Sequence, residues 1–355
     1  MKTGKTLQEL AVEIDRQNKV KKDYIAKTGD MKMVVTKPND RGYRYPRLRL
    51  SGLSQFGIND IAHDQIGTKV GIPTKYYNRM LTEQPELLAT NVNTWLQKEP
   101  TKRMVRTLDG QVRAFLSERY RRIDNFDIAQ AIFPIISDMP DASVESCELT
   151  ERRMYLKVVN PRITTEIAPG DIVQSGLLIS NSETGLGSVS VMPLVYRLVC
   201  KNGMIAADSG KKKYHIGRTN DADDNYEIFR SETIYADDKA FLMKLEDIVR
   251  ATADSIQFER IVSAMRTGTD AKITSDDVPG VVELASKAYG IQEKESSGVL
   301  DYLIRGGDLT LYGLANAVTQ QAQDVDSYDR STELEMTAWS MLNMSRNDWT
   351  HLNAA

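Results

Sequence analysis

The sequence predicts an α+β fold, in which a basic N-terminal part with a mostly antiparallel sheet and helices is followed by an acidic all-α C-terminal part. Two observations predict this. Period-two alternation of apolar and polar residues, typical of strands, is concentrated before about residue 226, whereas helical spacing continues to the C-terminus. The charge changes sign near the same place: residues 1–218 contain 34 Lys and Arg against 24 Asp and Glu, and residues 219–355 contain 12 against 25. We therefore expect two domains, 1–218 and 219–355.

The first hundred residues predict helices around two short strands. Residues 1–22 alternate charged and apolar side chains as an amphipathic helix does. Residues 31–37 and 47–53 alternate with period two and are expected to be half-buried strands. The segment that joins them, PNDRGYRYP, has turn residues at both ends and a basic and aromatic middle. Apolar residues at three and four spacing then predict helices within 57–98.

The middle of the basic part predicts a series of antiparallel strands. Asp109-Gly110 lies between two alternating runs, which indicates a two-residue hairpin, and Asn202-Gly203 is expected to form a second hairpin turn. A short helix is expected at 126–138. The remaining strands are expected at 143–150, 153–159, 171–182 and 187–207.

The acidic part predicts helices throughout. Residues 232–265 can form one long amphipathic helix. Shorter helices are expected at 275–290, 296–307, 309–323 and 331–342. This acidic part is expected to mediate self-assembly or contacts with a partner.

Composition indicates a reducing compartment and no membrane segment. No run of about 18 apolar residues occurs, and the N-terminus lacks the features of a signal peptide, so a cytoplasmic protein without membrane association is expected. The two cysteines, Cys147 and Cys200, are far apart and form no CxxC pair. We therefore expect reduced core thiols, neither a disulfide nor zinc ligands.

Sequence signatures of catalysis and of cofactor binding are missing. The histidines His63, His215 and His351 have no partner at metal-ligand spacing. Complete phosphate-loop, dinucleotide, nucleophile-elbow and HExxH motifs are absent. We expect no cofactor and no dedicated metal site, and a binding protein rather than an enzyme. A metal-dependent nuclease stays open, because carboxylates such as Asp109 and Asp124 could hold a magnesium ion beside arginines.

Three basic segments, 41–49, 102–122 and 209–218, combine cations with tyrosines. Binding of single-stranded nucleic acid needs this mixture, because cations replace the counterions of the phosphates and flat rings stack on bases. Arginine also chelates phosphate with two hydrogen bonds. The candidate nucleic-acid-binding residues are Arg41, Tyr43, Arg44, Arg103, Arg106, Arg113, Arg119, Tyr120, Arg121, Arg122, Lys211, Lys212, Lys213, Tyr214 and Arg218.

Other interpretations of these segments stay open. Arg119, Arg121 and Arg122 could instead pair with Glu118, Asp124 and Asp127 to fix the turn into the next helix. The lysine run could be a solvated loop, and the two oppositely charged halves could neutralise each other on docking.

Residues 65–81 have the spacing of a helix-turn-helix. In that pattern Pro73 would open the second helix and leave Lys75, Asn78 and Arg79 exposed. Such patterns arise by chance in many helical hairpins, so a purely structural helix pair is the favoured interpretation.

Several segments together resemble a known family. GIPTKYYNRM, NVNTWL, MVRTLDGQVRAFLSERYRRIDN, YRLVCKNGM, LYGLANAVTQQAQ and ELEMTAW resemble, in order and spacing, the phage- and plasmid-borne proteins of the domain-of-unknown-function family numbered nine hundred and thirty-two. The resemblance extends from about Leu50 to Leu342. It implies a mobile element in a bacterial cytoplasm or a phage-infected cell and supplies no catalytic residues. The order of parts is also similar to phage single-strand annealing proteins, an analogy of architecture alone.

These observations lead to one expectation and two alternatives. We expect a non-catalytic phage- or plasmid-type DNA-binding protein, a single-strand binding, annealing or recombination accessory that forms a homo-oligomer. One alternative is a counter-defence protein that binds a host protein through its acidic part. The other is the metal-dependent nuclease. A single binding groove requires the three basic segments to converge on one face.

Overall fold

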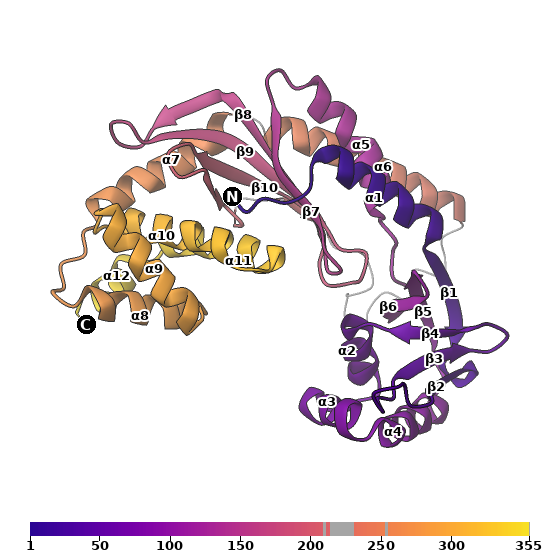
Figure 1. The fold of residues 1–355 in the computed structure, drawn as a ribbon. Helices are drawn as coiled ribbons and strands as arrows, with labels where there is room; N and C mark the ends of the chain where they lie inside the picture. Colours follow the sequence, from indigo (N-terminus) through magenta and orange to yellow (C-terminus); the bar gives the residue numbers. More distant parts are fainter. Residues whose placement is uncertain (209–210, 214–230, 253–254, 355) are drawn as a thin grey trace.

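The fold consists of two sheets and a C-terminal group of helices. In the computed structural model, which describes residues 1–208, 211–213, 231–252 and 255–354, the class is α+β as expected. Figure 1 shows the first sheet at one end of an arc, the second sheet in its middle and helices α8 to α12 at the other end.

The first sheet and three helices make up residues 22–117, which we call the N-terminal unit. The strand order is β1-β5-β6-β4-β3-β2, and neighbours are antiparallel except β4 and β6. The strands are β1 (Lys22–Lys27), β2 (Met31–Val35), β3 (Pro46–Leu50), β4 (Gln55–Ile58), β5 (Lys102–Leu108) and β6 (Gln111–Ser117), with a 3-10 turn η1 (Thr28–Asp30). The helices are α2 (Asp60–Lys69), α3 (Thr74–Glu83) and α4 (Pro85–Lys98). They share one core with the inner face of the sheet, through residues such as Met33, Leu48 and Leu88.

The predicted hairpin at Asp109-Gly110 is confirmed. Leu108 pairs with Gln111, and the two turn residues have φ values of 50° and 75°. Both φ values are positive, as the tight turn between twisted strands requires, which explains the choice of an aspartate and a glycine.

The free edge of β2 is covered by a side chain. Asn93 of α4 accepts from the N–H of Met33 at 2.7 Å and donates to its carbonyl at 2.8 Å. The amide thus bonds to the edge strand as a neighbouring strand would, which blunts one edge of the sheet.

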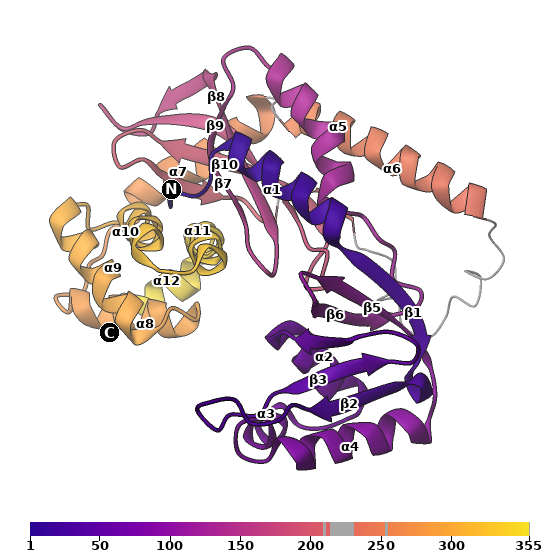
Figure 2. The ribbon, with the colours of Figure 1, turned by 45° about the vertical axis from the view of Figure 1, so that its right-hand side comes forward.

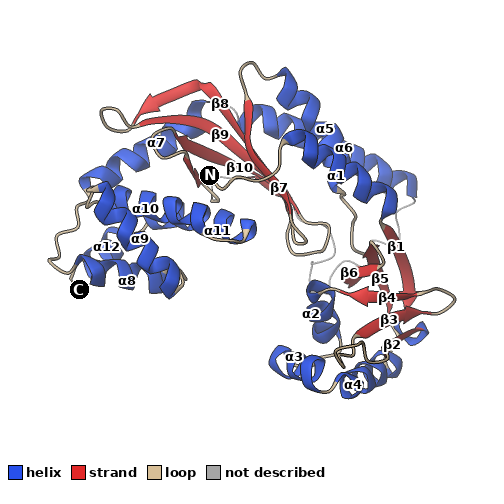
Figure 3. Ribbon diagram, in the orientation of Figure 1, coloured by secondary structure: helices blue, strands red, loops and turns tan. Residues whose placement is uncertain are grey.

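The second sheet lies between two groups of helices (Figure 3). Its order is β11-β10-β9-β8-β7, with β12 also pairing with β10. The strands are β7 (Ser143–Leu149), β8 (Met154–Glu166), β9 (Ile172–Asn181), β10 (Val189–Arg197), β11 (Asn202–Ile205) and β12 (Lys211–Lys213). One face packs on α1 (Leu7–Val20), α5 (Asn125–Asp138) and α6 (Ser231–Thr252).

The other face of this sheet packs on α11 (Tyr328–Leu342), through residues such as Tyr155, Leu178 and Met192. The remaining C-terminal helices are α7 (Ser255–Asp270), α8 (Val278–Ala288), α9 (Glu293–Gly306), α10 (Leu311–Asp324) and α12 (Arg346–Leu352), which share a core with α11 and with Val173, Val195 and Met204 of the sheet. A fully buried ion pair joins Lys157 of β8 to Glu335 of α11, and the Lys157 ammonium lies 4.8 Å from the centre of the Tyr328 ring. The helical part is therefore docked on the sheet by a polar contact as well as by apolar packing.

One prediction about this region is wrong. Asn202 and Gly203 are buried inside β11 and form no hairpin turn, because the Asn202 amide donates to Thr319 of α10 and the glycine permits close approach of Leu194. The connection instead uses residues 198–201, where Lys201 has a φ of 51°. The helix expected at 232–265 corresponds to α6 and α7; residues 253–254 between them lie outside the described part, so a single continuous helix stays a prediction.

Candidate nucleic-acid interface

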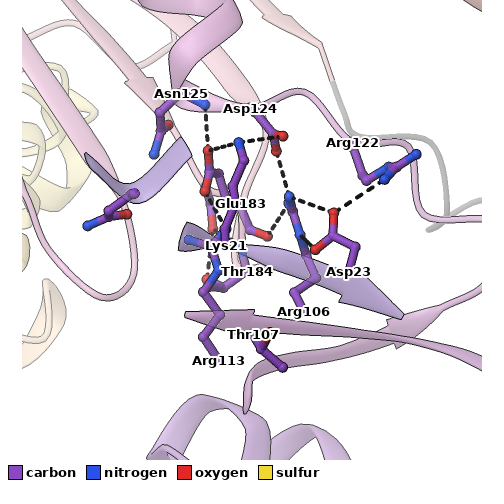
Figure 4. A network of polar contacts seen from close by, with 12 residues as sticks. Lys21, Asp23, Arg106, Thr107, Arg113, Arg122, Asp124, Asn125, Glu183 and Thr184 are labelled. Atoms are coloured by element: carbon purple, nitrogen blue, oxygen red, sulfur yellow. Dashed lines mark hydrogen bonds and ion pairs between the residues drawn. The ribbon is translucent and has the colours of Figure 1, made fainter. Parts of the chain in front are cut away.

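One of the arginines expected to contact nucleic acid is buried between the two sheets. Arg106 of β5 has a side chain with 0% exposure. Its guanidinium contacts Asp23 of β1 at 2.9 Å and Asp124 at 2.6 Å, and it donates to the backbone carbonyl of Glu183 at 2.9 Å (Figure 4). These contacts occupy the donors that a phosphate would need.

A second arginine and a lysine extend the same network. Arg113 of β6 contacts the Glu183 carboxylate at 2.6 Å, and the other oxygen of that carboxylate accepts from the N–H of Asn125 at 2.6 Å. Lys21 contacts Asp124 at 2.7 Å. We call this network the junction clasp; its members are Lys21, Asp23, Arg106, Arg113, Asp124 and Glu183.

The junction clasp is electrically balanced, with three cations and three carboxylates. Burial alone would raise the pKa of Asp124, but the charges of Arg106 and Lys21 outweigh it and hold this pKa well below its usual range. The carboxylate is therefore ionised at neutral pH. The clasp joins the N-terminal unit to the second sheet through chain segments that are far apart in sequence.

The turn after β6 is buried in the same way. Arg121 forms ion pairs with Asp237 and Asp238 of α6. Tyr120 is buried and donates its hydroxyl to the carbonyl of Ser182 at 3.1 Å. Pairing of Arg121 with carboxylates was one of the open interpretations, but the partners lie on α6 and not at the neighbouring positions considered.

Four expected contact residues therefore need correction: Arg106, Arg113, Tyr120 and Arg121 hold the fold together and do not lie on a surface that phosphates reach. The cause is that their partners, including Asp23, Glu183 and Asp237, come from distant segments that local alternation cannot reveal.

The other residues of the central and third segments are dispersed. Arg119 is exposed, and Arg122 has 56% of its side chain exposed and lies 3.4 Å from Asp23. Arg103 is half-buried on the helix-covered side of the first sheet. Lys211, Lys212 and Lys213 form β12, Tyr214 and Arg218 lie outside the described residues, and no common face of the three segments is established.

The first basic segment, in contrast, lies on an exposed hairpin. We call residues 31–50, which comprise β2, β3 and their connecting loop, the β2–β3 arm; it contains six Lys and Arg and one Asp. Lys32 is directly opposite Arg49, and both are exposed. Like charges at directly opposite positions repel each other. Neither has a carboxylate within ion-pair distance in the described part of the chain.

The tip of the arm presents two tyrosines to solvent. Tyr43 is 60% exposed and Tyr45 is 54% exposed. The loop is shaped by Asn39, whose side-chain oxygen accepts from the N–H groups of Arg41 and Tyr43 at 3.0 Å and 2.9 Å. The two views in Figures 1 and 2 show this loop beside α3. The tip therefore holds its rings outward on an ordered turn.

One arginine of the tip fixes its position, and another is free. Arg44 forms an ion pair with Glu86 at the start of α4, which ties the loop to the helices. Arg41 is exposed and has no ion-pair partner among the described residues. The arm therefore brings together Arg41, Tyr43 and Arg44 from the candidate set with Tyr45 and Arg49 of the same predicted segment, and adds Lys32.

Comparison with protein families identifies the larger part of the chain. Residues 113–353 match the family model described as "Domain of unknown function (DUF932)". The chain belongs to this family. Comparison with curated proteins and with solved structures gives no significant match. The family membership expected from the sequence is confirmed, and its phage or plasmid context stays a prediction.

The DUF932 match begins at Arg113 in β6. It therefore covers the second sheet and the C-terminal helices, while the β2–β3 arm and helices α2 to α4 precede it. The junction clasp has members on both sides of this boundary, so it connects the DUF932 segment to the basic unit before it.

Helices α2 and α3 form the expected helix pair. Gly71 has a φ of 70° in the turn, and Gly67 lies against the Tyr77 ring, where a Cβ atom would come within 2.9 Å of the ring. Lys75, Asn78 and Arg79 are exposed, as the spacing predicts. Arg79 pairs with Glu83 at 3.0 Å. The pair is confirmed as structure, and a role in reading a DNA groove stays a prediction.

The described residues contain neither a metal-binding cluster nor a membrane-spanning helix. No group of three or more His, Cys, Asp or Glu side chains there could hold a metal ion. No helix in that part is long and apolar enough to cross a membrane.

Proposed function

We propose that this DUF932 protein binds single-stranded nucleic acid, DNA in the first instance, through the β2–β3 arm. The observation that carries the proposal is the exposed pair of Lys32 and Arg49, directly opposite each other and without a carboxylate at ion-pair distance among the described residues, on the hairpin that presents Tyr43 and Tyr45. An anionic strand laid along the arm would relieve the repulsion between the two cations and provide bases for the rings.

The charge of the surrounding unit favours the same ligand. Residues 22–117 contain sixteen Lys and Arg and nine Asp and Glu, so the unit is basic although the whole chain has a net charge of −3. Binding to phosphates gains free energy chiefly from the release of condensed counterions. Arg41 and Arg49 can each chelate a phosphate with two hydrogen bonds, and stacking on tyrosine tolerates any base.

The test is fluorescence anisotropy of a labelled single-stranded DNA oligonucleotide with the full chain. The triple variant K32Q/R41Q/R49Q removes three phosphate contacts. Each contact adds about 0.7 to the slope of log affinity against log salt, so the slope should fall by about 2. Affinity at low salt should fall more than tenfold.

The matched control is K287Q/K294Q/R305Q, which makes the same charge change on the exposed surfaces of α8 and α9. This variant should bind like the unmodified protein. Absence of binding at low salt, or an equal loss in both triple variants, rejects the proposal.

We extend this proposal to a role in strand annealing or recombination, in the cytoplasm of a cell that carries the mobile element. Such a role requires several copies of the protein on one nucleic-acid strand. The acidic helical part, with 12 Lys and Arg against 25 Asp and Glu in residues 219–355, is the surface we assign to assembly. Light scattering after gel filtration, with and without oligonucleotide, tests it: a mass of one chain under both conditions rejects assembly.

A further inference from the structure

Arg103 differs from the other arginines of the β5–β6 hairpin. It pairs with Ala26 of β1 and Ser117 of β6, and it shares the helix-covered face of the sheet with Val105. Its side chain is half-buried, and its Nε atom is buried without a hydrogen-bond partner. Among the described residues, no carboxylate lies within ion-pair distance of Arg103.

A second cation lies close to Arg103. Lys69 is the last residue of α2 and is also half-buried. Burial lowers the pKa of Lys69, and the positive charge of Arg103 lowers it further. Burial likewise lowers the pKa of Arg103. The geometry of α2 agrees with this proximity, because its start is bonded to Val112 and its Gln65 accepts from the N–H of Phe115, so its last turn, with Lys69, lies toward the end of β6 where Ser117 pairs with Arg103.

The nearby carboxylates do not neutralise this pair. Glu99 acts on Lys69 and Glu118 acts on Arg103 only through space, and Glu118 contacts Lys102 at 3.8 Å. A hydroxyl completes the surroundings: the Oγ1 atom of Thr101 is buried and has no hydrogen-bond partner. Thr101 directly precedes β5, and its carbonyl accepts from the N–H of Thr28, so the extended pairing with the chain after β1 continues to it and its side chain emerges on the same side as that of Arg103.

We infer that Lys69, Thr101 and Arg103 form a binding site for one phosphate group. Holding two half-buried cations near each other without a counter-ion costs free energy, through desolvation and repulsion. A bound phosphate dianion would offset that cost. The Arg103 guanidinium can offer Nε and one terminal nitrogen to two phosphate oxygens, Lys69 supplies a point charge, and the Thr101 hydroxyl donates to a third oxygen.

This site is independent of the β2–β3 arm. Lys32 and Arg49 alternate with the buried residues Met31, Met33, Leu48 and Leu50, so they lie on the outer face of the sheet, opposite to Arg103. The phosphate group can belong to inorganic phosphate or a small phosphorylated molecule, or to a polynucleotide. The inference does not require the arm to bind nucleic acid.

The experiment compares thermal unfolding of the full chain in inorganic phosphate and in chloride at equal ionic strength. We expect phosphate at saturating concentration to raise Tm by about 3 °C or more. The variants R103M and K69M should lose this rise. In chloride, R103M should unfold no earlier than the unmodified protein, because removal of an unpaired half-buried cation costs little; a purely structural arginine would lower Tm instead.

The matched control is K102M, which removes the neighbouring, exposed cation of the same strand; it should keep the full response to phosphate. The inference is overturned if phosphate does not raise the Tm of the unmodified protein, or if R103M and K69M keep the rise.

A second measurement identifies the source of the phosphate. Single-stranded oligonucleotides with and without a 5′ phosphate are titrated against the unmodified protein and R103M. A tenfold loss of affinity in R103M assigns the site to a polynucleotide, whereas unchanged affinity together with the Arg103-dependent Tm rise assigns it to a small phosphate. The triple variant of the arm should keep the rise in either case, so failure of the proposed function and failure of this site are distinguishable.

Discussion

Glu183 contacts Arg113 at 2.6 Å across the boundary between the two sheets. Glu183 comes from the buried segment after β9, and Arg113 is the first residue of the DUF932 match. Lys21 and Asp124, which contact each other at 2.7 Å, lie where the chain enters and leaves the N-terminal unit. The chain passes between the N-terminal unit and the DUF932 segment at two neighbouring places. These two connections and the buried ionic network hold the two parts together.

Removal of one charge from the junction clasp should destabilise the protein strongly. Arg106→Met leaves Asp23 and Asp124 buried without their shared cation, and breaking a buried ion pair in this way costs about 3–5 kcal/mol. Urea unfolding followed by circular dichroism measures the loss.

The control for this variant is Arg122→Met, at the exposed border of the same network. Its side chain is 56% exposed and 3.4 Å from Asp23, so its removal should cost less than about 1 kcal/mol. If both variants lower the free energy of unfolding equally, burial of Arg106 does not add to its contribution to stability.

Stability should fall as the pH decreases from about 6.5 to about 4, because of His63. Burial lowers the pKa of His63 to about 4, and its Nδ1 atom lies 2.8 Å from the Tyr77 hydroxyl. In the unfolded chain this histidine has an ordinary pKa of about 6.5. Between that pH and about 4, the histidine is protonated in the unfolded state but not in the folded state, which lowers the free energy of unfolding. The difference corresponds to about 3 kcal/mol once the pH reaches 4.

The measurement is the free energy of unfolding between pH 4 and 7.5, for the unmodified protein and for His63→Gln. Glutamine keeps a polar partner for Tyr77 but does not titrate. The variant should lose the part of the pH dependence that lies above pH 4, while the acidic carboxylates keep theirs. An unchanged slope would show that His63 is protonated in the folded protein.

Local structure was largely predictable from the sequence. The hairpin at Asp109-Gly110, the strands β7 to β10 and the helices α8 to α11 follow from turn chemistry and periodicity, which act within a few residues. The strands β1 and β4 were not predicted, because they are short and their apolar residues show no clean alternation.

The candidate site was only partly predictable, because the role of an arginine depends on partners far away in sequence. Arg106 and Arg49 look equivalent in the sequence, since both stand on alternating strands. Arg106 is buried because Asp23 and Asp124 form ion pairs with it, whereas the cross-strand neighbours of Arg49 are Lys32 and Gln55, neither of which is a carboxylate. The signal that separates them is long-range pairing, which a single sequence does not contain.

Loss of the amide that covers the sheet edge should weaken the N-terminal unit and open it to association. Asn93→Ala leaves the N–H and carbonyl of Met33 without their partner. Half-buried backbone groups without partners cost about 1–3 kcal/mol, and an uncovered edge strand pairs with other chains. We expect a lower urea midpoint and concentration-dependent dimers in gel filtration.

The control for the edge variant is Asn91→Ala on the same helix, which loses only a bond to the carbonyl of Leu87 and a sulfur contact. It should stay monodisperse to the same degree as the unmodified protein. Identical behaviour of the two variants would mean that α4 shields the edge by bulk alone.

The tyrosines of the arm should favour binding of single strands over duplexes. Their removal should leave the salt dependence of binding unchanged. The double variant Tyr43→Leu/Tyr45→Leu removes both exposed rings and no charge. Stacking contributes about 1–3 kcal/mol per base, so the affinity for a single-stranded oligonucleotide should fall at least tenfold. The slope against salt should stay the same, because it counts phosphate contacts. A duplex of the same sequence keeps its bases stacked on each other and should bind both proteins equally.

Tyr76→Leu provides the matched control, because Tyr76 is 49% exposed on α3 of the same unit and lies outside the arm. It should bind single strands as the unmodified protein does. If the double variant loses affinity for single strand and duplex alike, or if its salt slope falls, the rings act by holding the cations in place. Stacking changes the intercept of the plot of log affinity against log salt, and phosphate contacts change its slope. The intercept and the slope therefore separate the contribution of Tyr43 and Tyr45 from that of the three cations of the arm.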